Sequence, residues 1–305
     1  MQNYVGESAA LMAALGWTIS AVCWTSAGRS VGSLVVNTVR LVIALPLFLI
    51  YGVVVLGEAI PFSASLQTWL ILGGSGVLGF FICDMLLFRS FLMIGPRLAM
   101  LIFSLSPVVA SLCGWWWLGE TLSPMNMTGM AIALSGVSWV VLESPRRPTT
   151  AGSTKGEAPS HVPLRGIVFA FLAMLSQGVS GVIAKMGMQD LDSPVAATEI
   201  RLIAGLLCFL VLMPILGKHK ACFAVFKNRK IMTILTIGAI AGPSLGVVLL
   251  MFAFQHISTG LAMTFISLTP VMIIPFSVFV FKEHVSLRAM LGAVVACVGA
   301  AILLL

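Results

Sequence analysis

One acid and one base inside long apolar runs are the residues best placed to do chemistry. Asp84 lies mid-run in FFICDMLLF, and Lys185 lies near the end of GVIAKMGM. Charged groups in a membrane are costly unless paired or hydrated. We predict that Asp84 is a proton or cation site facing a central cavity; the alternatives are pairing with Arg or Lys, or simple protonation. We predict that Lys185 binds a substrate carboxylate or an acid; the alternative is a side chain reaching the headgroups.

A serine and a proline recur at one spacing in two apolar runs. Ser104 with Pro107 and Ser267 with Pro270 form this pair. Proline removes a backbone donor and frees a carbonyl one turn earlier. Freed polar groups are tolerated in membranes where protein or a water-lined cavity satisfies them. We therefore predict serines that contact substrate and prolines that bend helices during gating, with a static kink as the alternative.

Two arginines occupy equivalent places in the two halves of the sequence. Arg40 and Arg201 each lie inside the second apolar run of their half. Their repetition favours a structural role, such as tethering helix ends, over substrate binding. Glu199 lies two residues from Arg201, so the two side chains do not share a helix face, and we expect Glu199 at the membrane interface. Four residues are weaker candidates for substrate binding: Trp17, Trp24, Gln177 and His256.

Two glutamates follow equivalent apolar runs. Glu120 and Glu283 each precede another predicted helix. A helix N-terminus favours an anion. We predict that each glutamate has a structural or gating role at the start of the next helix.

The elements that must position these residues are membrane helices. Hydrophobic residues make up 59% of the 305 residues and charged residues only 9%, whereas soluble domains are about a quarter charged. Since a span needs about 20 apolar residues, the chain has room for roughly ten spans and no soluble domain. We place the helices at 8–27, 33–56, 67–92, 97–118, 124–142, 165–187, 194–216, 230–254, 258–281 and 286–305.

The sequence divides into two similar halves. Residues 1–142 form the first half, 143–164 a polar linker rich in Pro, Ser, Thr and Gly, and 165–305 the second half. Gly95–Leu142 aligns without gaps with Ser258–Leu305, and proline, glutamate and glycine positions match. Each repeat would hold five helices. Because five is odd, the second copy would enter the membrane upside down, which is typical of alternating-access transporters.

Basic residues predict the orientation. Lys and Arg gather in the loops after odd-numbered helices, and the opposite side has only Lys185. Positive charge marks cytoplasmic loops. We therefore expect the central linker in the cytoplasm and both termini outside.

Several classes of function lack their signatures. The sequence has no GxxxxGK[ST] nucleotide loop and no HExxH zinc motif. The pattern GxSxG occurs at 28–32 and 242–246, but next to or inside predicted membrane helices and not at the strand-to-helix turn that a nucleophile elbow requires. Its six cysteines form no CxxC pair, so we predict neither a metal site nor a disulfide framework. The net charge is +7, and most of the basic residues lie between the apolar runs. This placement favours contact with lipid headgroups over binding of nucleic acid. We expect no enzyme activity and no cofactor.

The chain resembles the drug/metabolite transporter superfamily, specifically its ten-helix EamA-type members. The resemblance rests on GPRLAMLIFSLSPVVASLCGWWWLGETLS and its echo STGLAMTFISLTPVMIIPFSVFVFKEHVS, and on Arg40, Arg201 and Trp17. It implies a central cavity lined by helices one to four and six to nine, with helices five and ten at the periphery. It also implies transport of metabolites, often amino acids, in some members coupled to protons or to exchange.

We therefore predict a multi-pass secondary transporter of the cell membrane, in bacteria the inner membrane. It would export small polar metabolites such as amino acids by alternating access. Protons or a counter-substrate are candidate partners. Stripes of small residues on helices five and ten predict close helix packing, and a homodimer through these helices is a further option. The alternatives are a lipid-linked or nucleotide-sugar translocator of the same fold, or an intramembrane enzyme.

Overall fold

The computed structural model describes residues 4–143, 163–269, 271–272, 274 and 286–302, and every regular element within them is helical. The first half contains α1 (Val5–Val31), α2 (Ser33–Tyr51), the π-helical η1 (Gly52–Leu56), α3 (Leu66–Gly76), π-helical η2 (Val77–Cys83), α4 (Asp84–Phe103), α5 (Ser106–Leu118) and α6 (Pro124–Glu143). The second contains α7 (Leu164–Gly187), α8 (Pro194–Ile215), α9 (His219–Phe226), α10 (Arg229–Ala239), π-helical η3 (Ile240–Gly246), α11 (Val247–His256), α12 (Thr259–Ile266) and α14 (Leu287–Ile302). The predicted site residues Pro270 and Glu283 lie outside the described residues.

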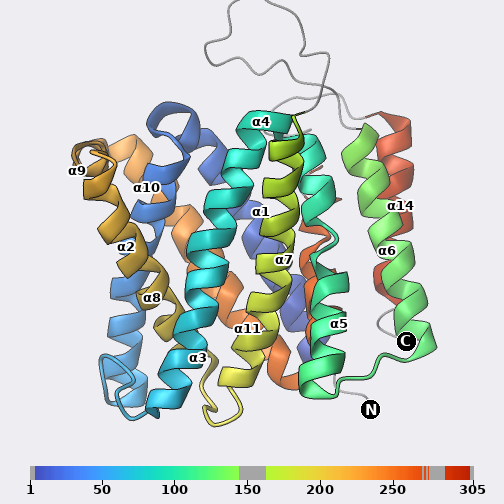
Figure 1. The fold of residues 1–305 in the computed structure, drawn as a ribbon, viewed down its shortest axis with the longest axis horizontal. Coiled ribbons are helices and arrows are strands. Elements are labelled where there is room, and N and C mark those ends of the chain that lie inside the picture. The colour runs from blue at the N-terminus through green and yellow to red at the C-terminus, as the bar shows by residue number, and fades with distance from the viewer. Residues whose placement is uncertain (1–3, 144–162, 270, 273, 275–285, 303–305) are drawn as a thin grey trace, which may run out of the picture.

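Six helical stretches are long and apolar enough to cross a membrane, and shorter apolar helices accompany them. The six are Val5–Gly28, Leu34–Val54, Leu66–Ser90, Leu164–Gly187, Pro194–Ile215 and Arg229–His256. They lie side by side across the molecule (Figure 1). The chain is therefore a multi-pass membrane protein.

Irregular helix geometry repeats in the two halves. The π-helical segments η2 and η3 occupy equivalent positions in the repeat, Val77–Cys83 and Ile240–Gly246. The helix also breaks equivalently, because α4 ends at the cap residue Ser104 and α12 at the cap residue Ser267. Pro107, the second residue of α5, follows the first break. These two π-helical segments and these two helix ends therefore recur at equivalent positions of the repeat.

Two predicted boundaries are wrong. We expected a loop over 93–96, but α4 continues through it, from Asp84 to Phe103. We expected a loop over 218–230, but α9 forms there. Its Val225 is buried against apolar side chains of α2 and α10, so tertiary packing outweighs the local charge.

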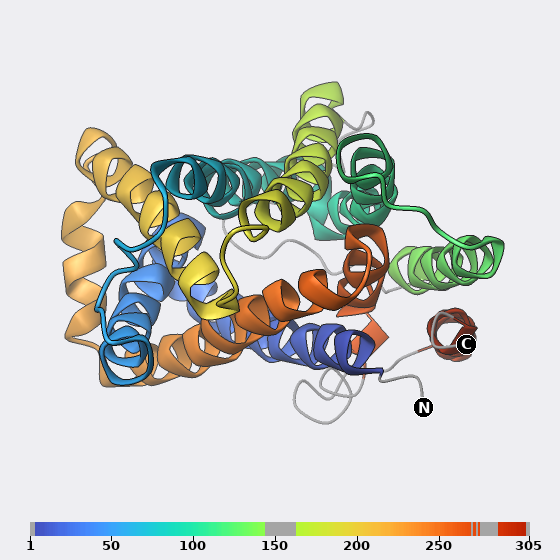
Figure 2. The same ribbon diagram turned by 90° about the horizontal axis from the view of Figure 1, so that it is seen from below.

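The small-residue stripes of α6 and α14 pack against each other within the chain. A methyl group on Gly136 would meet the backbone of Ala296, and one on Gly299 would meet the backbone of Ala133. The two helices stand together at one end of the molecule, at the right of Figures 1 and 2. A homodimer through these helices stays a prediction, and it would have to use their other faces.

The two halves begin at opposite edges of the molecule. In Figure 1, α1 starts at the lower edge, near the label N, and α7 starts at the upper edge. The view from below shows the second-half elements α10 to α12 running alongside α1 (Figure 2). This contact between the halves positions the residues described next.

Candidate functional site

An ion pair between α2 and α4 lies at the centre of the site. The Arg40 guanidinium donates a hydrogen bond from Nη2 to Oδ2 of Asp84. Arg40 is 1% exposed, and the Asp84 side chain is 17% exposed. The pairing that we named as an alternative for Asp84 is therefore present, and the acid also keeps some accessible surface.

Two tryptophans of α1 cover this ion pair. The Trp24 ring stacks under Arg40, with Cζ 4.4 Å from its centroid, and Trp17 meets Trp24 edge to face at 5.7 Å. The indole Nε1 atoms of both tryptophans and Nε of Arg40 are buried without a hydrogen-bond partner among the described residues. Buried donors are normally satisfied. This cluster of donors would therefore suit a ligand that carries oxygen acceptors.

The second half closes over the tryptophans. A methyl group on Gly238 of α10 would lie 2.7 Å from Nε1 of Trp24, and one on Gly246 of η3 would lie 3.4 Å from Nε1 of Trp17. Glycine at these positions lets the backbone come close to the rings. The cluster therefore lies where the two repeats meet, which is where inverted-repeat transporters bind their substrates.

Gln177 of α7 contacts η2 immediately before Asp84. Its Oε1 accepts a long hydrogen bond from Sγ of Cys83, 3.5 Å away, and Cys83 directly precedes Asp84. The structure thus gathers Trp17, Gln177, Arg40 and Asp84 from four elements, α1, α7, α2 and α4. Trp24, a weaker candidate from the sequence, completes the cluster. Its spacing of seven residues from Trp17, two turns of one helix face, was the available signal.

Lys185 belongs to a different network. Its Nζ lies 2.6 Å from Oε1 of Glu120 and donates to the carbonyl of Ile257 at 2.7 Å. Glu120 also accepts from the backbone N–H of Thr259 at 3.0 Å and from its hydroxyl at 3.0 Å. Glu120 therefore stabilises the start of α12 and not, as we expected, that of the next helix in the sequence. The network ties the α5–α6 loop to two elements of the second half.

Arg201 has no acidic partner among the described residues. Its guanidinium donates to Oγ of Ser180 at 3.2 Å and to the sulfur of Met251 at 3.2 Å, and it lies 5.4 Å from the Phe80 ring centroid. Ser180 in turn exchanges two 2.8 Å hydrogen bonds with Ser75 of α3. Arg201 thus joins α8 to α7, α11 and the first half.

Glu199 does not lie at the membrane interface. It is 0% exposed, and neither carboxylate oxygen has a hydrogen-bond partner among the described residues. We expected a headgroup position because Glu199 is near the start of α8. The elements α2, α3, η2 and α11 pack against α8, and Glu199 is buried instead.

Comparison with known sequences decides the family. The sequence profile described as the EamA-like transporter family matches residues 4–142 and, separately, residues 164–305. The chain belongs to the EamA-like transporter family. The two matches coincide with the two halves predicted from the repeat.

The fold of this EamA-like transporter occurs among solved structures. One of them, titled only as the crystal structure of a protein, matches with a TM-score of 0.78 at 18% identity over 99% of this chain and 96% of that one. At that identity the likeness concerns the fold alone. No curated protein matches the sequence.

The remaining predicted residues of the transporter lie at the helix breaks. Ser104 and Ser267 are buried, and the Ser267 hydroxyl donates to the Thr264 carbonyl at 2.7 Å. Their role in substrate binding and that of Pro107 in gating stay predictions.

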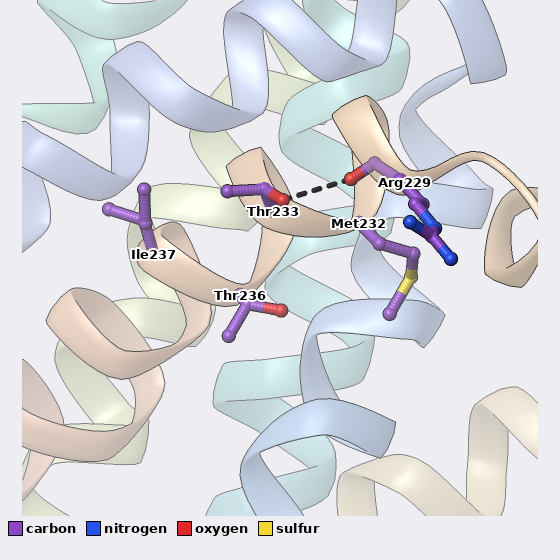
Figure 3. Close-up of a pocket in the computed structure, with 5 residues that line it drawn as sticks. All are labelled: Arg229, Met232, Thr233, Thr236 and Ile237. Atoms are coloured by element: carbon purple, nitrogen blue, oxygen red, sulfur yellow. Dashed lines mark hydrogen bonds between the residues drawn. The ribbon is translucent and has the colours of Figure 1, made fainter.

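A hollow of about 400 Å³ lies elsewhere, on α10. One face of that helix lines it, as Figure 3 shows. The lining residues are Arg229, Met232, Thr233, Thr236 and Ile237. The Thr233 hydroxyl donates to the Arg229 carbonyl at 2.9 Å, so it is already satisfied. None of the predicted site residues lines this hollow, and we assign it no part in the site.

Proposed function

We propose that this protein is a secondary transporter that exports small polar metabolites, amino acids in particular, from bacterial cells across the inner membrane. Ten spanning helices, arranged as two inverted five-helix repeats, would alternate access to a central cavity. The helix breaks at Ser104 and Ser267 recur at equivalent positions. They support this, because interrupted helices in both repeats are typical of transporter binding sites.

The cluster around Asp84 is the observation that carries the proposal. It combines one carboxylate with a guanidinium and two indole N–H groups. Within the described part of the chain, both indole N–H groups and Nε of Arg40 have no hydrogen-bond partner. Such a set matches both charges of an amino acid: the substrate carboxylate would accept from the donors, and its ammonium group would approach Asp84. The edge of Asp84 that remains accessible leaves room for that contact.

The network around Lys185 would serve as a gate at one edge. It links Glu120 of the first half to Lys185 and Thr259 of the second. Breaking these contacts would let the halves separate at that edge. This role replaces direct substrate binding in our assignment of Lys185, and we keep transport as its test.

Counterflow in proteoliposomes tests the function. Purified protein is loaded with unlabelled compound and assayed for uptake of the same radiolabelled compound, over a panel of amino acids, nucleotide sugars and other metabolites. We expect exchange of amino acids that Asp84→Asn abolishes and Lys185→Ala reduces. Asp190→Asn, at an exposed acid, is the matched control. Exchange of nucleotide sugars alone would favour the alternative translocator, and normal transport by both variants would contradict the site.

Cysteine labelling tests the orientation. In a cysteine-free background, Ser153→Cys places one thiol in the linker. We expect an impermeant maleimide to label it only after lysis, because the basic loops face the cytoplasm. Labelling in intact cells would reverse the proposed orientation.

A further inference from the structure

A buried carboxyl group in α8 has no role in the site described above. Glu199 is 0% exposed, and both of its carboxylate oxygens lack a partner in the described part of the chain. An ionised carboxylate without pairing or hydration is very costly in such surroundings. Protonation removes that cost, since a neutral carboxyl group carries no charge to solvate.

The surroundings of Glu199 offer it no counter-charge. The elements packed against α8 are α2, α3, η2 and α11. Among the described residues, α3 has no titratable side chain and the others carry Arg40, Tyr51, Cys83 and His256. Arg40 is bound to Asp84, Tyr51 is exposed, Cys83 faces Gln177, and His256 bonds the Phe252 carbonyl.

The charged groups nearest in sequence and in space do not neutralise it either. Arg201 lies on the same helix but on another face, and its contacts go to Ser180 and Met251. The acid that acts on Glu199 through space is Glu58, which has the same sign of charge. A sodium ion would need several oxygen ligands, and no described oxygen bonds the carboxylate. These surroundings favour a proton over a metal cation.

The repeat shows that the scaffold does not require an acid at this position. The sequence Thr198-Glu199-Ile200-Arg201 corresponds to residues 37–40 of α2, and Glu199 corresponds to Thr38. The Thr38 hydroxyl donates to the carbonyl of Leu34 one turn earlier, at 3.1 Å. A self-satisfied hydroxyl is therefore enough for packing in one half. The acid in the other half needs a separate explanation.

We propose that Glu199 is the proton-carrying group of this transporter. In the enclosed conformation its carboxyl group holds a proton. When α8 separates from its neighbours, water reaches the group, the O–H bond breaks, the proton passes to water and the carboxylate remains hydrated. Glu199 lies five residues after Pro194, roughly 8 Å along the helix from its start, so protons would exchange with the edge where α8 begins. The coupling role rests on the proposed transport function, whereas the protonation itself does not.

Infrared spectroscopy of the purified protein in lipid tests protonation without any substrate. The expected result is a protonated-carboxyl band at neutral pH that Glu199→Gln lacks and that Asp190→Asn keeps. Glutamine copies the shape of the neutral acid. If Glu199→Gln does not yield folded protein, Glu199→Asp should retain a shifted band. A wild-type protein without the band, or a band unchanged in Glu199→Gln, would overturn the proposal.

Proteoliposomes with an imposed pH gradient test the coupling, with a mixture of radiolabelled L-amino acids as probe. We expect wild type and Asp190→Asn to accumulate label against its gradient. Glu199→Gln should lose that accumulation completely but keep counterflow. Equal accumulation by Glu199→Gln, or loss of its counterflow as well, would contradict a coupling role. If the wild type moves no label in either assay, the proposed amino-acid transport fails, and the infrared result alone decides whether Glu199 holds a proton.

Discussion

Arg40 and Arg201 occupy equivalent places in the two repeats, yet their surroundings differ in kind. Arg40 binds a carboxylate and lies over an indole ring, whereas Arg201 contacts a hydroxyl and a thioether sulfur. The repeat therefore fixes where a buried arginine stands but not what neutralises it. The partners of Arg40 change character in the second repeat, because Asp84 corresponds to Val247 and Trp24 to Lys185. Such asymmetry is what a site for an asymmetric substrate requires.

The largest loss of stability should come from breaking the ion pair between Arg40 and Asp84. Arg40→Met leaves Asp84 without its cation, and removing one partner of a buried ion pair costs about 3–5 kcal/mol. We expect a corresponding loss in the free energy of unfolding, measured in detergent with a chemical denaturant. The double variant Arg40→Met with Asp84→Asn should recover much of it. No recovery would mean that Arg40 acts by packing on Trp24 and not by neutralising Asp84.

Equivalent residues should behave alike where the repeats are symmetric. Gly136 and Gly299 correspond and lie against the backbone of the opposite helix in the α6–α14 pair. Replacing either by alanine should cost about 1–3 kcal/mol, because the helices must move apart. Gly74→Ala is the control, since a methyl group there meets open space. Thermal unfolding measures all three, and clearly unequal costs for Gly136 and Gly299 would contradict the symmetry of this pair.

Breaking the network of Glu120, Lys185 and Thr259 should cause an intermediate loss of stability. Glu120→Gln weakens the contact with Lys185 and the hydrogen bonds at the start of α12, and losing such a cap costs about 1 kcal/mol. A double-mutant cycle with Lys185→Met should give a coupling energy of about 0.5–3 kcal/mol, typical of residues in one network. Additive effects of the two substitutions would show that the pair does not hold the halves together.

The smallest loss of stability should come from replacing Arg201. Arg201→Met leaves no acid unpaired, because the partners that it loses are Ser180 and Met251. We expect a cost of about 1 kcal/mol, the net value of a typical hydrogen bond. Denaturant unfolding under the conditions used for Arg40→Met gives the comparison. A cost as large as that of Arg40→Met would show that Arg201 neutralises an anion, for which Glu199 would be the candidate.

The sequence by itself determined the helical class, the division into halves and the family. Long apolar runs have one stable solution in a membrane, since a helix satisfies its own backbone, and the repeated prolines and glycines mark equivalent bends. The helix break before Pro107 and the packing of the glycine stripes follow from these local signals. Boundaries were wrong at α4 and at α9, and in α9 the burial of Val225 outweighs the local charge.

Only the tertiary structure decided which charged groups meet. Spacing along a helix gives the face on which a residue lies, but not which distant helix covers that face. Asp84 therefore forms an ion pair with Arg40, whereas Lys185 pairs with Glu120, which also binds the start of α12. Glu199 shows the same principle. Its place near a helix start suggested an interface, but α2, α3, η2 and α11 pack against α8 and Glu199 is fully buried. Long-range packing sets the cost of a charge in this protein, and no local pattern in the sequence contains that information.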